Sequence, residues 1–164
     1  MVFSVLAFIA IVISICIPER KKSLGIQSLN CLCEALYDYT ISAYTGAVLG
    51  ILNFIRTLLF INKEKFAKIF YLLILIIFEC LLVINCVYTW AGVISLLPTT
   101  ASIIRTYCLW QTNMKIVRIS GVIAGLLYGI YYIYYRSPFM ILGYFLLMIA
   151  AIISIYKYDI KKNA

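Results

Sequence analysis

The stretch PFMILGYFLLMIAAIISIYK, residues 138–157, runs for nineteen residues without a charged side chain before it ends in a lysine. An α-helix needs about 20 largely apolar residues to cross the hydrocarbon core of a bilayer, and about 17 as a practical minimum. The run therefore predicts a transmembrane helix. It decides the fold, because the same pattern recurs along the rest of the chain.

The overall composition supports this reading. Hydrophobic residues make up 65% of the 164 residues, charged residues make up 12%, and there is no histidine. An ordinary soluble domain is about 45–50% apolar and about 25% charged. The chain thus has too little polar surface to face water and is predicted to be a polytopic membrane protein of one domain. Its net charge of +8 lies in short loops between apolar runs, which argues against a nucleic-acid-binding face.

Seven apolar runs are long enough to span a bilayer, so we expect an all-α membrane protein over residues 1–164. The links between the runs are short, as they are between sequential antiparallel helices. The first run lacks a basic segment before it and small residues after it, which favours a retained helix over a signal peptide. The predicted spans are residues 1–17, 26–42, 44–62, 67–87, 91–110, 118–135 and 138–157.

Lysine and arginine residues gather in alternate loops. Eleven lie after the first, third, fifth and seventh spans, whereas Arg136 alone follows the sixth, and the loops after the second and fourth have none. Because cytoplasmic loops carry an excess of these residues, the N-terminus is predicted to lie outside and the C-terminus in the cytoplasm, in a bacterial-type inner membrane. The eleven residues are Arg20, Lys21, Lys22, Lys63, Lys65, Lys68, Lys115, Arg118, Lys157, Lys161 and Lys162.

Two blocks of the chain are similar to each other. ALY at 35–37 is matched by LLY at 126–128, and LG at 49–50 by LG at 142–143, with offsets of 91 and 93 residues. Since one span separates the blocks, both have the same membrane orientation, which predicts a repeat about an axis along the membrane normal. We therefore expect two parallel three-helix bundles, residues 1–62 and 91–157, with a linking helix at 67–87 and a tail at 158–164.

Three stretches carry a resemblance to a known family: ERKKSLGIQSLN (19–30), ILNFIRTLLF (51–60) and LPTTASIIRTYCLW (97–110). With the 3+1+3 arrangement, they resemble the YgjV-like bacterial inner-membrane proteins, within the SWEET and PQ-loop superfamily of SemiSWEET-like transporters. The resemblance covers nearly the whole chain. It implies alternating access about hinges at Pro18 and Pro98, and a pocket asparagine at Asn53. Neither proline is followed by glutamine, and the counterpart of Asn53 has no asparagine.

Polar side chains share one face of the second predicted span. Asn30, Glu34 and Asp38 are four residues apart, so they stack on one side of a helix. An ionised carboxylate at mid-bilayer costs on the order of 2.5–3.5 kcal/mol and normally faces the bundle interior or a water-filled path. This face is therefore the strongest candidate for a functional site, with Asp38 reaching the headgroups as an alternative.

The repeat suggests what this face meets. An offset of 91 residues places Gly121, Gly125 and Gly129 at the equivalent positions, so an acidic wall is expected opposite a wall without side chains. Such glycines also allow close helix packing, which remains the alternative. The interpretation that we prefer is a substrate path near the midplane, where transporters hold their solutes. The path residues would be Asn30, Glu34, Asp38, Asn53 and Gly125.

Other charged and aromatic residues have simpler interpretations. Glu34 and Arg56 lie at similar depths at 1.5 Å per residue, which predicts an ion pair that could also serve only to hold two helices together. Glu79 is interpreted as structural, or as a partner of Arg105. Five tyrosines predict an interfacial aromatic belt, with stacking on a substrate as the alternative. They are Tyr128, Tyr131, Tyr132, Tyr134 and Tyr135.

These observations favour a transporter or facilitator of a small polar solute, either sugar-like, vitamin-like or cationic, with proton coupling through Glu34 as an option. The alternative is a non-transporting inner-membrane scaffold or assembly protein. An enzyme is not expected, because the chain has no histidine and neither an HExxH nor a GxSxG motif. We expect no cofactor, no metal and no nucleic-acid partner; the partners are the lipid bilayer and the solute, and homo-oligomerisation stays open.

Overall fold

The computed structural model describes residues 2–16, 20–61, 68–111 and 114–157. Over these residues the protein is all-α, as predicted, with seven α-helices and one short 3-10 helix, η2. Each α-helix coincides with one predicted span, although α2 begins six residues before its span and α5 begins five residues after the start of its own. The elements are α1 (Val2–Cys16), α2 (Arg20–Thr40), α3 (Tyr44–Ile61), α4 (Lys68–Tyr88), η2 (Val93–Ser95), α5 (Leu96–Trp110), α6 (Met114–Tyr134) and α7 (Pro138–Ile155).

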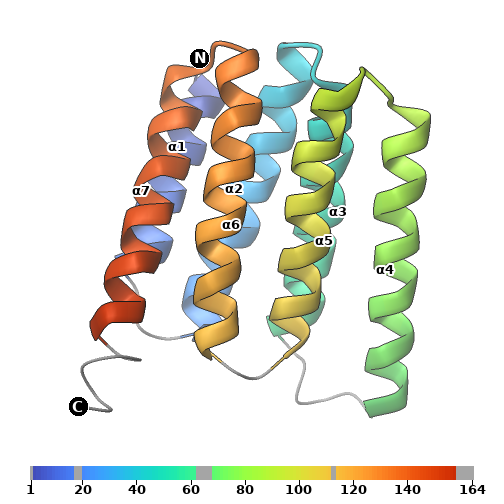
Figure 1. The fold of residues 1–164 in the computed structure, drawn as a ribbon, viewed down its shortest axis with the longest axis vertical. Helices are drawn as coiled ribbons and strands as arrows, with labels where there is room; N and C mark the ends of the chain where they lie inside the picture. The colour runs from blue at the N-terminus through green and yellow to red at the C-terminus, as the bar shows by residue number, and fades with distance from the viewer. Residues whose placement is uncertain (1, 17–19, 62–67, 112–113, 158–164) are drawn as a thin grey trace.

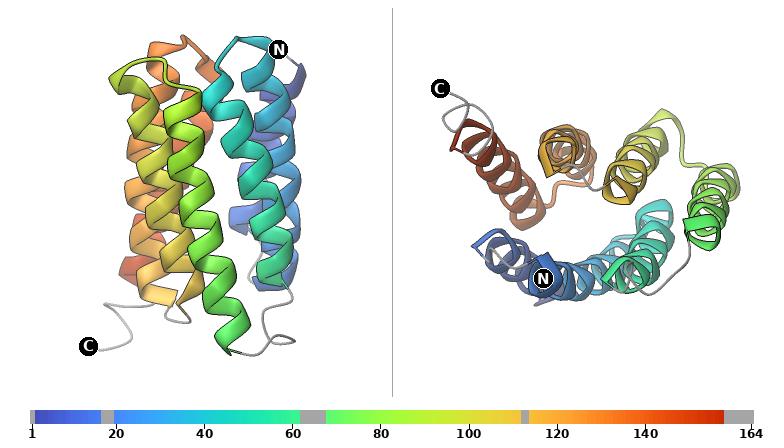
Figure 2. Two further views of the ribbon diagram at one scale, coloured as in Figure 1. Left: turned by 90° about the vertical axis from the view of Figure 1, so that its right-hand side faces the viewer. Right: turned by 90° about the horizontal axis from the view of Figure 1, so that it is seen from below.

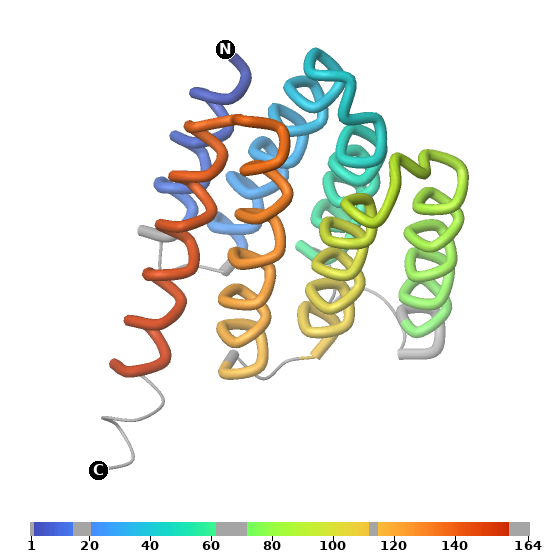
Figure 3. The backbone as a smooth tube through the Cα atoms, turned by 45° about the horizontal axis from the view of Figure 1, so that its top comes forward, coloured from blue at the N-terminus to red at the C-terminus, as the bar shows by residue number. Residues whose placement is uncertain are grey.

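The helices form two rows that face each other (Figures 1 and 2). In one row α1 packs on α2 and α2 on α3, and in the other α5 packs on α6 and α6 on α7. The rows meet where α1 contacts α7 and where α3 contacts α5, while α4 lies at one edge against α3 and α5. Successive helices run in opposite directions, which can be followed along the tube in Figure 3.

Two tight turns, between α2 and α3 and between α6 and α7, are built in the same way. Ser42 (φ 59°) and Arg136 (φ 52°) each adopt the left-handed conformation just after a helix. The amide of the residue that follows donates to the carbonyl of Asp38 (2.9 Å) in the first turn and of Tyr132 (3.0 Å) in the second. A left-handed residue followed by this bond is the Schellman ending of a helix. The two left-handed residues are 94 positions apart, which gives a structural offset between the halves of the chain.

Large apolar side chains lie on the surface and charged side chains lie in the interior, which is the opposite of a soluble protein. The outer face of α4 exposes large apolar residues such as Leu73, Ile76 and Val83, whereas the charged residues Glu34 and Arg56 are buried between the rows. Such an apolar surface suits contact with lipid. Lipid offers no hydrogen-bond partners, so the polar groups of the protein must find their partners inside the bundle. Within the described residues, three segments are long and apolar enough to cross a membrane: Tyr44–Ile61, Lys115–Tyr134 and Pro138–Ile155. Two shorter apolar helices are Val2–Ser14 and Leu72–Tyr88.

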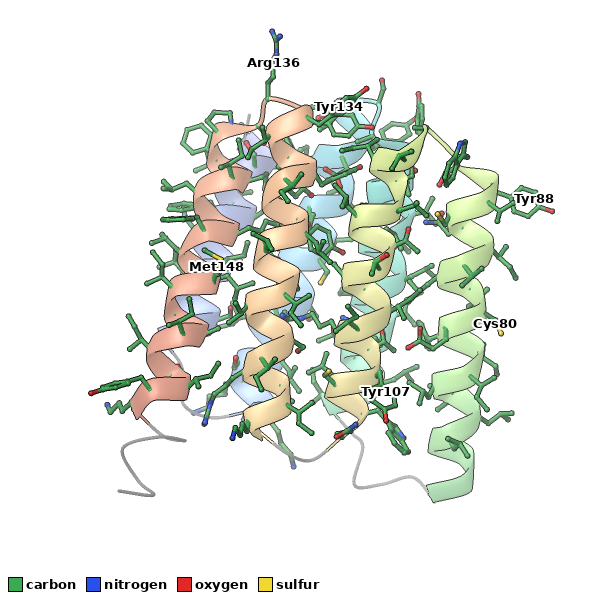
Figure 4. All side chains as sticks on the ribbon, viewed as in Figure 1. Cys80, Tyr88, Tyr107, Tyr134, Arg136 and Met148 are labelled. Carbon is green, nitrogen blue, oxygen red and sulfur yellow. The ribbon has the colours of Figure 1, made fainter. Side chains whose placement is uncertain are left out.

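The two ends of the bundle differ in charge. Lys21 and Lys115 lie where α2 and α6 begin, and Lys157 lies just after α7 at the same end. Arg136 projects from the opposite end, near Tyr134 (Figure 4). We call these the basic end and the Arg136 end.

Candidate functional site

A cavity of about 40 Å³ lies between the two helix rows. Roughly 10–15 Å³ of such volume is needed to hold one water molecule, so this cavity has room for a few waters or a very small solute. The structure thus brings Asn30, Glu34 and Asn53 to one cavity, whereas Asp38 and Gly125 do not line it. The polar lining residues used below are Gln27, Asn30, Glu34, Asn53, Arg56, Arg105, Tyr128 and Tyr144.

Glu34 of α2 is held by tyrosine hydroxyls from the opposite row. Its Oε1 accepts hydrogen bonds from Tyr132 of α6 (2.7 Å) and Tyr144 of α7 (2.5 Å), and the carboxyl group is buried. The Tyr132 hydroxyl also lies 3.0 Å from Oδ2 of Asp38. Both acids of the predicted polar face are therefore tied across the bundle by one tyrosine, and Asp38, only 1% exposed, does not reach the headgroups.

The interfacial-belt interpretation is wrong for three of the five tyrosines. Tyr131 and Tyr132 are 0% exposed and Tyr128 is 6% exposed, whereas Tyr134 is on the surface. The rings of Tyr128 and Tyr144 stack with centroids 4.8 Å apart. The physical reason is that these side chains point into the bundle, where the Tyr132 hydroxyl meets the acids of α2 and the Tyr128 hydroxyl meets Asn53 and Ser102, polar groups that lipid could not satisfy.

Arg56 of α3 is fully enclosed, and none of the hydrogen bonds that the structure shows for it goes to a carboxylate within the described part of the chain. Its Nη1 donates to Oγ1 of Thr106 (2.6 Å) and to the carbonyl of Ser102 (3.4 Å), both on α5. Its Nε has no hydrogen-bond partner among the described residues. The predicted ion pair between Glu34 and Arg56 is therefore corrected: both residues line the cavity, but the carboxylate bonds to tyrosines and the guanidinium to α5.

Asn53 lies at the centre of a small hydroxyl network. Its Nδ2 donates to Ser102 (3.1 Å) and to Tyr128 (3.3 Å), whose hydroxyl oxygens are 2.7 Å from each other. The Oδ1 atoms of Asn53 and of Asn30 have no hydrogen-bond partner among the described residues, although both side chains are buried. Both asparagines line the cavity, so two amide oxygens without a described partner belong to its lining residues.

Arg105 separates this cavity from a second one. With the amide of Gln27 oriented so that its oxygen faces α5, Arg105 donates to that oxygen from Nη2 and from Nε (3.1 Å). The second cavity, of about 180 Å³, also touches Gln27 and Arg105 and extends to Arg118 and Ser154 near the basic end. Gln27 and Arg105 thus form the shared boundary between the two spaces.

The expectation of a bare glycine wall opposite Glu34 is wrong. A Cβ on Gly125 would lie 3.0 Å from Cβ of Met148 and from the carbonyl of Tyr144, so this glycine packs against α7. The two matched turns are 94 residues apart and not 91, and the residue 94 positions after Glu34 is Tyr128, which does line the cavity.

The remaining predicted residues lie elsewhere. Pro98 is buried in the first turn of α5, at the Arg136 end and not near the basic end, and a proline there interrupts no helical hydrogen bond. Pro18 falls outside the described residues. Glu79 has no hydrogen-bond partner within those residues, and its electrostatic interaction is with Arg56 and not with Arg105. No group of three acidic, cysteine or histidine side chains among the described residues could hold a metal ion.

Sequence reasoning missed several polar residues of the site. Ser102 and Thr106 hold Asn53 and Arg56, and Gln27 holds Arg105. In the sequence, the stretch that contains Ser102 and Thr106 carries only the family resemblance. Ser102 and Thr106 are four residues apart and so share one helix face, as the acids of α2 do. Hydroxyl groups are common in apolar helices, so this spacing indicates a polar site less clearly than two acids do.

An all-α bundle with an apolar exterior and a charged interior defines the class of integral membrane proteins. A family model described as Imp-YgjV, bacterial inner membrane protein, matches residues 1–162. The chain belongs to this family, and its location is the bacterial inner membrane. Searches of curated proteins and of solved structures found no significant match.

Proposed function

We propose that the protein is a transporter or facilitator of a small polar solute, which passes between two parallel three-helix units by alternating access. In this proposal α1–α3 and α5–α7 are the units of a SWEET-like 3+1+3 arrangement and α4 is the link. Two observations support the repeat. The α1–α7 contact corresponds to the α5–α3 contact when the units are exchanged, and the two Schellman turns are equivalent.

The observation that carries the proposal is the polar cavity between the rows. Intramembrane charged residues are costly and usually mark a substrate or ion path, and here Glu34, Arg56 and Arg105 share one small space. The second cavity extends from it toward the basic end, while stacked tyrosines lie on the opposite side. Opening the Gln27–Arg105 contact would connect the central site to the basic end, and access from one end at a time is what an alternating-access cycle requires.

The test is solute flux into proteoliposomes that contain the full chain. Light scattering after mixing with glycerol, erythritol, lactate or methylammonium would report permeation against protein-free vesicles. We expect at least one solute to enter faster with the protein, and Glu34→Gln and Asn53→Ala to slow that entry at least tenfold. Thr100→Ala, at an exposed position of α5, is the matched control and should leave it unchanged.

Two results would contradict the proposal. Undiminished solute flux in the Glu34→Gln variant would show that the central cavity is not the path of the solute. A folded wild-type protein that passes none of these solutes would favour the alternative, a non-transporting scaffold in which the buried polar residues only hold the helices together.

A further inference from the structure

Among the described residues, two arginines line the central cavity, and the hydrogen-bond partners that the structure shows for them are neutral groups. We propose that this cavity binds a small carboxylate that also carries a hydroxyl group, with Arg56 and Arg105 holding its carboxylate. This inference names the substrate class of the transporter and rests on that proposed function. It also departs from the cationic solute that the acids of α2 alone suggested.

The charge of the lining favours an anion. Arg56 and Arg105 contribute two positive charges to the cavity, and Glu34 contributes one carboxyl group. That carboxyl group already accepts two tyrosine hydroxyls, and Asp38 lies outside the lining. Glu79 interacts with Arg56 from α4 but makes no hydrogen bond within the described structure. Glu34 also attracts Arg105, so the three charged lining residues together carry one excess positive charge. A bound anion would offset that excess and lower the free energy of this site.

The guanidinium groups leave donors for such an anion. Arg56 uses Nη1 for Thr106 and Ser102, while its Nε is buried without a partner. Arg105 is only half-buried, and its contact is the neutral amide of Gln27 at the boundary of the two cavities. A planar guanidinium matches a carboxylate with two parallel hydrogen bonds, and a carboxylate could replace the amide oxygen of Gln27 at Arg105.

The asparagines indicate what else the solute carries. Asn30 Oδ1 and Asn53 Oδ1 are buried acceptors without partners among the described residues. A hydroxyl group can donate to one of them, whereas a halide ion or a plain fatty acid cannot. A site with buried polar groups rejects an analogue that leaves them unpaired. The central cavity alone is small, but the adjoining space of about 180 Å³ can hold the remainder of the molecule.

The experiment measures binding of radiolabelled lactate to the purified full chain in lipid nanodiscs, with unlabelled three-carbon competitors. Lactate carries a carboxylate and a hydroxyl, propionate lacks the hydroxyl, alanine is zwitterionic, and glycerol lacks the carboxylate. We expect lactate to compete best and propionate several-fold less well. Glycerol, alanine and chloride should not compete at equal concentration. Equal competition by glycerol, alanine or chloride, or no lactate binding by folded wild type, would overturn the proposal.

Arginine variants locate the site. Arg105→Gln should weaken lactate binding at least tenfold, and because this side chain is half-buried with a neutral partner, the variant is expected to fold. Arg56→Lys, which keeps the charge but loses the planar fork, should also weaken binding. Arg136→Gln, at the opposite end of the bundle, should bind as wild type does. Wild-type affinity in Arg105→Gln would overturn the assignment.

Solute flux tests the proposed transport function and lactate binding tests the carboxylate site, so the two can fail independently. Lactate binding without flux of any solute would keep the carboxylate site and reject the transporter. Flux of glycerol or methylammonium without lactate binding would keep the transporter and reject the carboxylate.

Discussion

Tyr132 of α6 donates a hydrogen bond to Glu34 of α2 across the bundle, with 2.7 Å between the two oxygens. The same hydroxyl lies 3.0 Å from Asp38, one helical turn along α2. A tyrosine has one hydroxyl hydrogen, so it can donate to only one of the two acids at a time. The hydroxyl can therefore alternate its hydrogen bond between the two carboxyl groups, and it links both acids of α2 to the opposite row.

Replacing Tyr132 with phenylalanine removes this link while keeping the ring. We expect Tyr132→Phe to lower the free energy of unfolding by about 1–3 kcal/mol, because buried carboxyl groups lose a partner that lipid cannot replace. Reversible unfolding in mixed detergent micelles measures the change. Tyr134→Phe, at an exposed position two residues further along α6, should change it by no more than about 0.5 kcal/mol. Equal stability of the two variants would show that the link contributes nothing.

Thr106 supports Arg56 in a comparable way. Its Oγ1 accepts from Arg56 at 2.6 Å and donates to the carbonyl of Ser102 at the same distance. Thr106→Val keeps the shape but leaves a buried guanidinium short of an acceptor, so we expect a loss of about 1–3 kcal/mol. Thr100→Val on the exposed face of α5 is the control. If the loss persists when Arg56 is also replaced by methionine, the effect does not come from this contact.

The sequence was sufficient to predict the helices but not what their polar faces contact. Runs of about 20 apolar residues must form helices in a bilayer, because each backbone group needs a partner within its own segment. Whether Tyr131 lies in an aromatic belt or in the core depends on which helix covers it. Its amphipathic ring suits either place.

The errors in the site have a similar cause. Glu34 and Arg56 are predicted at the same depth along the membrane normal. Each residue also rotates the side-chain direction by about 100° around the helix axis, and that direction decides which partner a side chain meets. The repeat offset was read from short apolar matches that occur easily in such a composition. Ser42 and Arg136, which lie 94 residues apart, adopt a left-handed conformation. Neither residue type indicates that conformation in the sequence, because glycine is the usual residue there.

Gly50 lies at a close backbone contact between α2 and α3. A Cβ there would lie 2.7 Å from Cβ of Ala35 and 2.9 Å from its Cα, so backbone would have to move. We expect Gly50→Ala to destabilise the protein by about 1–3 kcal/mol through overpacking. Gly129→Ala is the matched control, since nothing lies within 4 Å of its Cβ position in α6. Alanine is the better helix former by about 1 kcal/mol, so this variant should be as stable as wild type or more stable. Destabilisation by both substitutions, or by neither, would contradict the close packing at Gly50.

The two unequal ends of the bundle predict its orientation in the membrane. Lys21, Lys115 and Lys157 lie at the basic end with the C-terminal end of α7, and positively charged ends stay in the cytoplasm. We therefore expect a green fluorescent protein fused after residue 164 to fluoresce in cells, because it folds in the cytoplasm but not after export through the general secretory pathway. Alkaline phosphatase, active only outside the cytoplasm, should be inactive at the C-terminus and active when fused after Arg136 at the opposite end. Active phosphatase at the C-terminus would reverse the bundle and place the opening of the second cavity outside the cell.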